Sequence, residues 1–207
     1  MRRPGSRIIE SEVADRLAIS RTPVRSALAR LMQEGYVVPG GGRQNRLSVT
    51  ALTVDDAREI FEIVGEIEGL AARRAAMLPA DTREEIASEL ALLDRALVQR
   101  AREEPPDTRE IFRLFTRFHR TYVEGGAGPR LRGLHDAIKP QADRYRRLYS
   151  TTQVARIERS VQEHVDIIEG IRRGDPDLAQ RAVQTNWRNA AGRLAEVIER
   201  LGEIGSW

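Results

Sequence analysis

Two arginines and a threonine stand close together in this sequence, where a helix is predicted to begin: Arg21, Thr22 and Arg25. A guanidinium group can donate paired hydrogen bonds to a guanine base, and a hydroxyl group can bond to a base or a phosphate. A helix that presents such groups at its N-terminal end is suited to the major groove of DNA. These three residues therefore predict recognition of double-stranded DNA.

The helix that carries these residues is expected over residues 22–34. Thr22 can act as its N-cap and Pro23 as its first residue, because the missing N–H of proline needs no partner there. Gly35 suits the left-handed conformation that ends many helices. The apolar residues recur every three or four positions and form one stripe, away from the arginines. They are Val24, Ala27, Leu28 and Leu31.

A glycine-rich hairpin is predicted directly after this helix, with strands at residues 36–39 and 46–50. At its tip Gly42 lets the backbone approach a DNA groove closely, and Arg43 and Arg46 can meet phosphates. An earlier helix over about residues 10–18 completes a winged helix-turn-helix. Considered alone, the segment at 22–34 also fits an ordinary surface helix with solvated arginines.

The segment from Ser20 to Arg25, Ser-Arg-Thr-Pro-Val-Arg, resembles the signature of the GntR family of winged-helix transcription regulators, in its FadR branch. The resemblance covers nearly the whole chain from Pro4 onward. It implies that Ser11 on the first helix contacts DNA, as does Ser20 in the signature. It also implies that Gly42 enters the minor groove together with Arg43.

Regulators of this branch usually carry one more amphipathic helix before the position of Pro4-Gly5, and this sequence begins almost at that point. Two alternatives follow: the natural chain starts further upstream, or the DNA-binding domain at residues 1–50 lacks its first helix. Val24, Leu28 and Leu31 are expected to pack less tightly as a result.

The charge of the chain is unevenly distributed. Residues 1–50 contain nine arginines and four acidic residues, whereas the whole chain has a net charge of only +3. A basic lobe on a near-neutral one favours contact with a polyanion. The sequence has no cysteine and no apolar run long enough for a signal peptide or a membrane span. A cytoplasmic protein without membrane contact is expected.

Beyond residue 53 every segment is predicted to be helical, and six long helices are expected to form an antiparallel bundle. The fold class is thus mainly α, a winged helix-turn-helix followed by an all-α bundle at residues 51–207. The resemblance implies that this bundle is an FCD domain, which binds an effector and forms a homodimer. The expected helices span about 53–78, 81–102, 107–123, 129–149, 154–173 and 175–201.

Two histidines are predicted to point into this bundle. His119 shares a helical face with Phe115 and Tyr122, and His164 shares one with Val161 and Ile168. A single inward histidine is most often a hydrogen-bonded core residue. Two such residues on different helices favour a shared polar site, because imidazole is a common metal ligand.

The resemblance gives this site a form, since many FCD domains bind a divalent metal through an Asp or Asn and three histidines. His119 and His164 match two of the histidines, whereas Phe115 stands at the Asp/Asn position and Asn186 at that of the third histidine. Val64 stands where the family often has an arginine. We therefore expect no tightly bound metal, at most weak binding of a zinc-like ion, and an effector more apolar than a simple carboxylic acid.

Three residues are candidate polar anchors for the effector: Arg144, Tyr145 and Tyr149. His135 is expected at the surface, and Trp187 is expected in packing or in the dimer interface. The alternative is that Phe115 fills the cavity and no effector binds there. The full predicted pocket comprises Val64, Phe115, His119, Arg144, Tyr145, His164 and Asn186.

The leading interpretation is a ligand-responsive transcription regulator that binds a short palindromic operator as a homodimer. Repression is the expected mode of regulation. Catalysis is not expected, because no nucleophile–base pair, phosphate loop or paired carboxylates stand out. Two alternatives remain at this point. One is an all-helical enzyme that binds a metal or ligand, and the other is a binding module whose small lobe no longer binds DNA.

Overall fold

The computed structural model describes residues 3–40, 46–148 and 157–203, which contain eight helices and one three-stranded sheet. The mainly α fold predicted from the sequence is confirmed. These residues form two compact units. The first comprises the described parts of Met1–Asp56 and Ile198–Trp207, and the second is Ala57–Val197. The division lies at residues 56 and 57, against residues 50 and 51 expected from the sequence.

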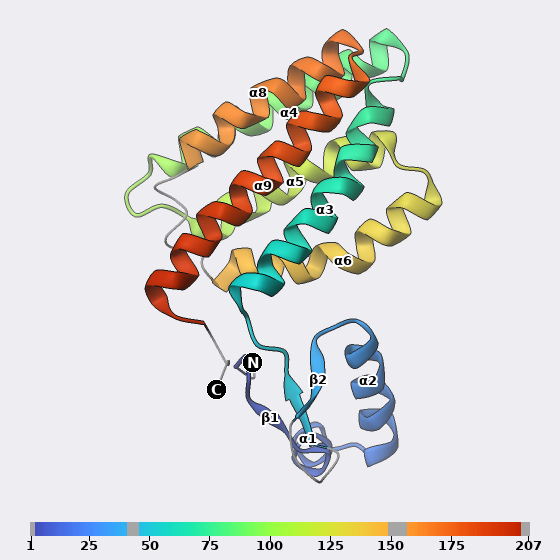
Figure 1. Ribbon diagram of the computed structural model, residues 1–207, viewed down its shortest axis with the longest axis vertical. Helices are drawn as coiled ribbons and strands as arrows, with labels where there is room; N and C mark the ends of the chain where they lie inside the picture. Colours follow the sequence, from blue (N-terminus) through green and yellow to red (C-terminus); the bar gives the residue numbers. More distant parts are fainter. Residues whose placement is uncertain (1–2, 41–45, 149–156, 204–207) are drawn as a thin grey trace. The chain divides into compact units, whose positions relative to one another are not determined.

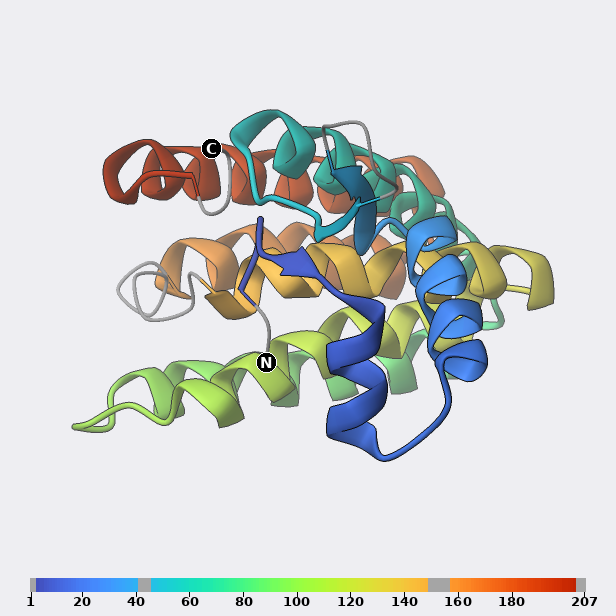
Figure 2. The same cartoon turned by 90° about the horizontal axis from the view of Figure 1, so that it is seen from below.

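The first unit is a winged helix-turn-helix, and Figure 2 shows its two helices joined by a short turn. Its strands pair antiparallel in the order β1-β3-β2. Strand β1 was not predicted, because two residues are too few to show an alternating pattern. The elements are β1 (Arg7–Ile8), α1 (Glu10–Leu17), α2 (Arg21–Gln33), β2 (Val37–Gly40) and β3 (Arg46–Val49).

Helix α2 begins one residue earlier than predicted. Ser20, in extended conformation, is the N-cap and makes no side-chain capping bond, so Thr22 lies inside the helix and the predicted cap at Thr22 is wrong. Pro23 is then the third helical residue, where a backbone N–H would also have no partner within the helix. Pro23 thus indicates the first turn of the helix but not the residue at which the helix begins. Gly35 ends the helix in the left-handed region as expected, with φ 78°.

The apolar stripe of α2 is buried only in part. Val24 is 3% exposed and Leu28 6%, and both belong to one core cluster with Ile8, Ala14 and Val37. In contrast, Leu31 is 37% exposed. The weak packing expected around these three residues therefore holds for Leu31 alone, because the sheet and α1 already cover the other two.

The second unit is built from the six predicted helices, which Figure 1 shows as long rods. The predicted caps at Thr53 and Asp107 are confirmed. Thr53 Oγ1 accepts from the N–H of Asp56 at 3.2 Å, and Asp107 accepts from two backbone N–H groups. The predicted start near residue 154 lies outside the described residues. The helices are α3 (Val54–Ala75), α4 (Ala80–Ala101), α5 (Thr108–Gly126), α6 (Pro129–Leu148), α8 (Ile157–Arg173) and α9 (Pro176–Leu201).

Glycines let two pairs of these helices approach closely. A Cβ added at Gly126 of α5 would lie 2.0 Å from the carbonyl oxygen of Ala71 in α3. A Cβ at Gly170 of α8 would lie 2.6 Å from the backbone nitrogen of Ala179 in α9. Both distances are far below van der Waals contact, so any other residue would force the helices apart.

We predict that Gly126→Ala destabilises the bundle by about 2 kcal/mol or more, because overpacking a close helix contact forces a backbone shift. Gly192→Ala is the matched control, since an added Cβ there meets nothing within 4 Å. It should be neutral or stabilising by up to about 1 kcal/mol, the usual gain in helix propensity. Urea unfolding followed by circular dichroism measures both. Equal unfolding midpoints for the two variants would contradict the close contact.

Candidate DNA interface and effector pocket

The first turn of α2 presents the residues predicted to read DNA. Arg21, Thr22 and Arg25 are exposed, as is Ser20, while Ser11 near the start of α1 is partly exposed. The wing lies largely outside the described residues. This applies to Gly42 and Arg43, and to the side chain of Arg46.

An ion pair joins the two helices at this exposed end. Glu10, the first residue of α1, accepts hydrogen bonds from Arg25 Nε at 3.2 Å and from Arg25 Nη2 at 3.1 Å. The Arg25 side chain is 72% exposed, so the pair contributes little stability but restricts the direction of the guanidinium. The contact also brings the start of α1, and with it Ser11, next to the first turn of α2.

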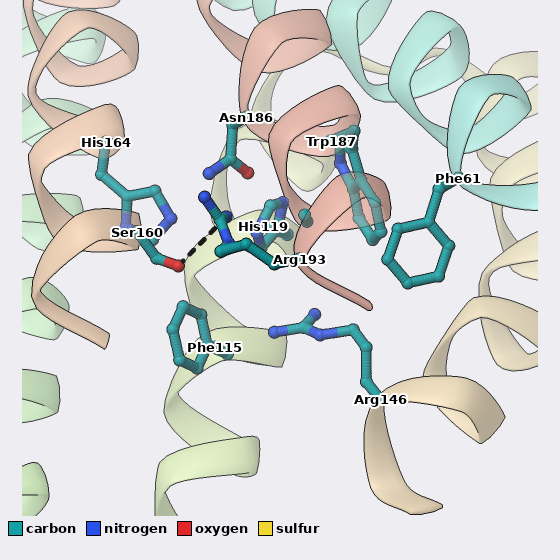
Figure 3. A pocket seen from close by; sticks show the side chains of 10 residues that line it. Phe61, Phe115, His119, Arg146, Ser160, His164, Asn186, Trp187 and Arg193 are labelled. Carbon is teal, nitrogen blue, oxygen red and sulfur yellow. Dashed lines mark hydrogen bonds between the residues drawn. The ribbon is translucent and has the colours of Figure 1, made fainter. Parts of the chain in front are cut away.

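The second unit contains a cavity of about 40 Å³ between helices α3, α5, α6, α8 and α9. Figure 3 shows the labelled side chains turned toward this common space. The lining combines aromatic rings with imidazole, amide and guanidinium groups. Its members are Phe61, Phe115, His119, Arg146, Ser160, His164, Asn186, Trp187, Ala190 and Arg193.

A fully buried carboxylate, Glu68 of α3, lies beside this cavity. Its Oε2 accepts hydrogen bonds from His119 Nδ1 and Tyr122 Oη, both at 2.7 Å, and from Trp187 Nε1 at 2.8 Å. Its Oε1 accepts from His135 Nε2 at 3.0 Å. Residues from three other helices, α5, α6 and α9, therefore converge on one side chain.

These partners keep Glu68 ionised. Burial alone would raise the pKa of this carboxyl, but His119, the hydrogen bond from His135 and the charge of Lys139 together hold it well below its usual range. Burial lowers the pKa of His119 to about 4, against the opposing effect of Glu68. Near neutral pH His119 is thus a neutral ring that donates from Nδ1, and its Nε2 carries the lone pair.

The second predicted histidine has its own carboxylate. His164 Nδ1 donates to Asp94 Oδ1 at 2.7 Å, and the ring stacks on Phe118 with a centroid distance of 3.8 Å. His164 is fully buried. Its Nε2 has no hydrogen-bond partner among the described residues.

Two guanidinium groups line the same cavity but differ in their pairing. Arg193 forms an ion pair with Glu163 at 2.6 Å and donates to Ser160 at 3.3 Å (Figure 3). Arg146 lies over the ring of Phe115 at 5.0 Å, and its side chain is only 11% exposed. Its Nη1 has no hydrogen-bond partner in the described part of the chain, and Asp143 lies 3.9 Å away.

The structure brings together four of the predicted pocket residues: Phe115, His119, His164 and Asn186. Val64 is buried in the core and does not line the cavity. Arg144 and Tyr145 do not line it either, and Tyr149 lies outside the described residues. The polar anchor predicted on this helix comes instead from Arg146, because a shift of one or two residues turns a helical side chain by 100° or more.

The prediction that His135 lies at the surface is wrong, because His135 is 5% exposed and bonded to Glu68. Trp187 is buried and packs edge-on against Phe61, as expected of a packing residue, and it also lines the cavity and donates to Glu68. Both bond to Glu68, which lies at helical spacing from the buried residues Val64 and Ala71 of α3. A charged residue on an apolar helical face, as at Glu68 between Val64 and Ala71, was the available signal.

The expectation of an effector more apolar than a simple carboxylic acid stays a prediction, although the lining contains the guanidinium groups of Arg146 and Arg193 beside its aromatic rings. The sequence did show that Arg146 and Arg193 lie on predicted helices. Their inward direction depends on how α6 and α9 pack, which the sequence alone does not state.

The donor set around the cavity does not fit a tightly bound metal. His119 and His164 could each offer Nε2, and carboxylates orient both rings as in many metal sites. Asn186 could offer an amide oxygen, since its nitrogen donates to Glu163. Phe115 has no ligand atom, and the nearby Arg146 cation opposes a dication. Among the described residues no group of three or more His, Cys, Asp or Glu side chains is placed to hold a metal.

A winged helix-turn-helix with an exposed arginine turn, followed by a helical domain with a polar internal cavity, defines a class of DNA-binding regulators. Residues 2–43 match the gntR family of bacterial regulatory proteins, and residues 59–189 match the FCD domain. The chain therefore belongs to the GntR family and carries an FCD domain. It is a DNA-binding transcriptional regulator and not an enzyme.

Relatives support this assignment over nearly the full chain. The HTH-type transcriptional regulator YdhC of Bacillus subtilis (strain 168) is 28% identical over 199 residues, covering 95% of this chain and 85% of YdhC. The HTH-type transcriptional repressor RspR of Escherichia coli (strain K12) is 27% identical, covering 97% and 82%. The solved structure of E. coli McbR/YncC shares the fold, with a TM-score of 0.65 at 20% identity, covering 94% of this chain and 89% of that one.

Within the described ranges no helix has both the length and the apolar character that a membrane crossing requires.

We predict that acid weakens the bundle through His119. In the folded state its pKa is about 4, so between pH 6.5 and 4 the unfolded chain binds a proton that the folded chain does not. Stability should fall as the pH decreases through this range, by up to about 1.4 kcal/mol per pH unit for this one proton. Ionised Glu68 adds a further loss below its usual pKa, because the unfolded carboxyl then takes up a proton.

His119→Asn tests this, because asparagine can still donate to Glu68 but cannot titrate. The free energy of unfolding of this variant at pH 7 should be lower than that of the parent. Between pH 6.5 and 4 it should decrease less steeply with pH than in the parent. Urea unfolding monitored by Trp187 fluorescence in a Trp207→Phe background reports directly on the Glu68 cluster. Identical slopes for parent and variant would contradict this assignment.

Proposed function

We propose that this regulator is a homodimeric repressor that binds a short palindromic operator and releases it in response to a small effector in the FCD cavity. The observation that carries the DNA-binding half of the proposal is the first turn of α2. There Arg21, Thr22 and Arg25 are exposed while Val24 and Leu28 anchor the helix in the core. The E. coli relative RspR is named a transcriptional repressor, which supports repression and not activation.

A homodimer would read a palindrome because two-fold protein symmetry requires two-fold sites. Each DNA-binding unit would place the arginine turn in one major groove, with the wing residues Gly42, Arg43 and Arg46 at the adjacent minor groove. An effector in the bundle would favour one spacing of the two DNA-binding units over another, which is a population shift. No resident metal ion is needed for this response.

We predict that Arg25→Ala relaxes base preference at one or two operator positions. An arginine–guanine contact is worth about 1–3 kcal/mol of discrimination. Selection of binding sites from a random duplex library, followed by affinity measurement on single-base variants, gives the preference at each position.

Arg30→Ala is the matched control, since Arg30 lies in the last turn of the same helix, is exposed, and pairs with Glu34. It removes the same charge without touching the first turn, so base preference should stay as in the parent. An equal loss of affinity on every sequence for Arg25→Ala would contradict base readout. Parent-like sequence preference for Arg25→Ala would contradict the orientation proposed for α2.

A further inference from the structure

We propose that α6 is the movable part of the FCD domain, and that it detaches from α3 and α9 as a unit while the other described helices stay packed. The reason is that α6 meets the bundle largely through polar and charged side chains. Detachment would withdraw Arg146 from the cavity and uncover Trp187. This inference goes beyond the proposed function, because it concerns the free chain and requires neither a ligand nor DNA.

The buried face of α6 is poor in apolar side chains. Among its described side chains the buried apolar ones are Ala142, 0% exposed, and Tyr145, 1% exposed. The other two buried side chains are those of His135 and Lys139. The shorter helix α8 buries four isoleucines: Ile157, Ile167, Ile168 and Ile171. Since apolar burial is the main source of packing free energy, α6 is held less firmly than α8.

A hydrogen bond from His135 connects α6 to the centre of the bundle. Its Nε2 donates to Glu68 Oε1 at 3.0 Å, while its buried Nδ1 has no hydrogen-bond partner among the described residues. When α6 detaches, Glu68 keeps its donors on α5 and α9, which are His119, Tyr122 and Trp187. The imidazole then gains water at both nitrogens. Detachment therefore breaks one hydrogen bond without leaving the buried carboxylate unpaired.

The cations of α6 have their carboxylate partner on the same helix. Lys139 Nζ donates to Asp143 Oδ1 at 2.5 Å, and Arg146 Nη1 lies 3.9 Å from the same oxygen. Both cations lie near the ring of Trp187, at 5.6 and 5.9 Å from its centroid. Burial lowers the pKa of Lys139 below its usual value, so this ammonium group gains hydration when it reaches water. The ion pair moves with α6, and no cation is left unpaired in the core.

The helix has a weak point and a hinge. Pro140 lies inside α6 and has no backbone N–H, so the carbonyl of Asp136 lacks its helical donor. At the other end, residues 127 and 128 separate α6 from α5, and Arg132 donates to the carbonyl oxygen of Glu124 at 3.0 Å. Figure 1 shows α6 along one edge of the bundle. We infer that α6 opens about its junction with α5.

Thiol labelling tests this directly, because the chain contains no cysteine. Ala142→Cys places a thiol on the buried face of α6, and Ala87→Cys places one in α4; both alanines are 0% exposed. Iodoacetamide should label the Ala142→Cys variant about tenfold faster or more, each rate being divided by that of the same variant unfolded in urea. The rate should also rise less steeply with urea, since a local opening exposes less surface than unfolding. Equal rates with equal urea dependence would overturn the inference.

A second substitution in these variants tests the role of His135. His135→Ala should speed labelling at Ala142→Cys by about tenfold, the equivalent of one hydrogen bond to a charged group. Leu134→Ala is the matched control, because Leu134 is the preceding residue of α6 and is 60% exposed. It should leave the rate as in the parent. If His135→Ala sped labelling at Ala87→Cys by the same factor, the bond would stabilise the whole bundle and the inference would be overturned.

Fluorescence tests whether the opening uncovers Trp187, which is 2% exposed. In a Trp207→Phe background Trp187 is the remaining tryptophan. Acrylamide should quench it more strongly in His135→Ala than in Leu134→Ala. Equal quenching in the two variants would contradict the direction of opening away from α9.

Hydrogen exchange of the unmodified chain keeps the inference testable if an introduced thiol disturbs the fold. A detached helix of this length that contains a proline is marginal in water, so its amides exchange while it is open. We expect the amides of residues 130–147 to exchange about tenfold faster or more than those of α4 and α8. Protection of α6 equal to that of α4 would overturn the inference. The measurement involves no DNA, so its failure would leave operator binding through Arg25 untouched.

Discussion

The FCD domain depends on one buried carboxylate. Glu68 is fully buried and accepts hydrogen bonds from His119, Tyr122, His135 and Trp187, so it connects helices α3, α5, α6 and α9. A buried charge is tolerated only when its hydrogen-bonding capacity is met, and here every partner is a side chain from another helix. The relative positions of four helices are thereby fixed at the point where the cavity is formed.

The same principle gives the cavity its chemistry. Glu68 and Asp94 each accept from the Nδ1 of one histidine, which turns the other ring nitrogen of His119 and His164 away from the carboxylate. Arg146 enters from α6 with aromatic rings beside it, and the carboxylate of Asp143 lies 3.9 Å from its Nη1. A carboxylate–histidine arrangement of this kind is familiar from metal sites. Here the nearby guanidinium of Arg146 opposes the binding of a dication.

The DNA-binding unit is organised by simpler means. Val24 and Leu28 anchor α2 in a small core, and Arg21 and Arg25 at its N-terminal end stay exposed. The ion pair between Arg25 and Glu10 is exposed, so it directs the guanidinium without holding it strongly. Such a weak internal contact suits a surface that must give up its contacts with solvent when it binds DNA.

The sequence by itself determined the winged helix-turn-helix, the six helices of the bundle and the inward faces of His119 and His164, while Phe115 and Asn186 were assigned to the site by the resemblance to FCD domains. Helical periodicity, capping residues and glycines are local signals, and a residue's face on its own helix follows from them. Only the tertiary structure decided that Glu68 would collect His135 and Trp187, and that Arg146 rather than Arg144 would enter the cavity. Those outcomes depend on how helices are rotated and packed against one another, and this depends on close contacts such as that between Gly126 and Ala71.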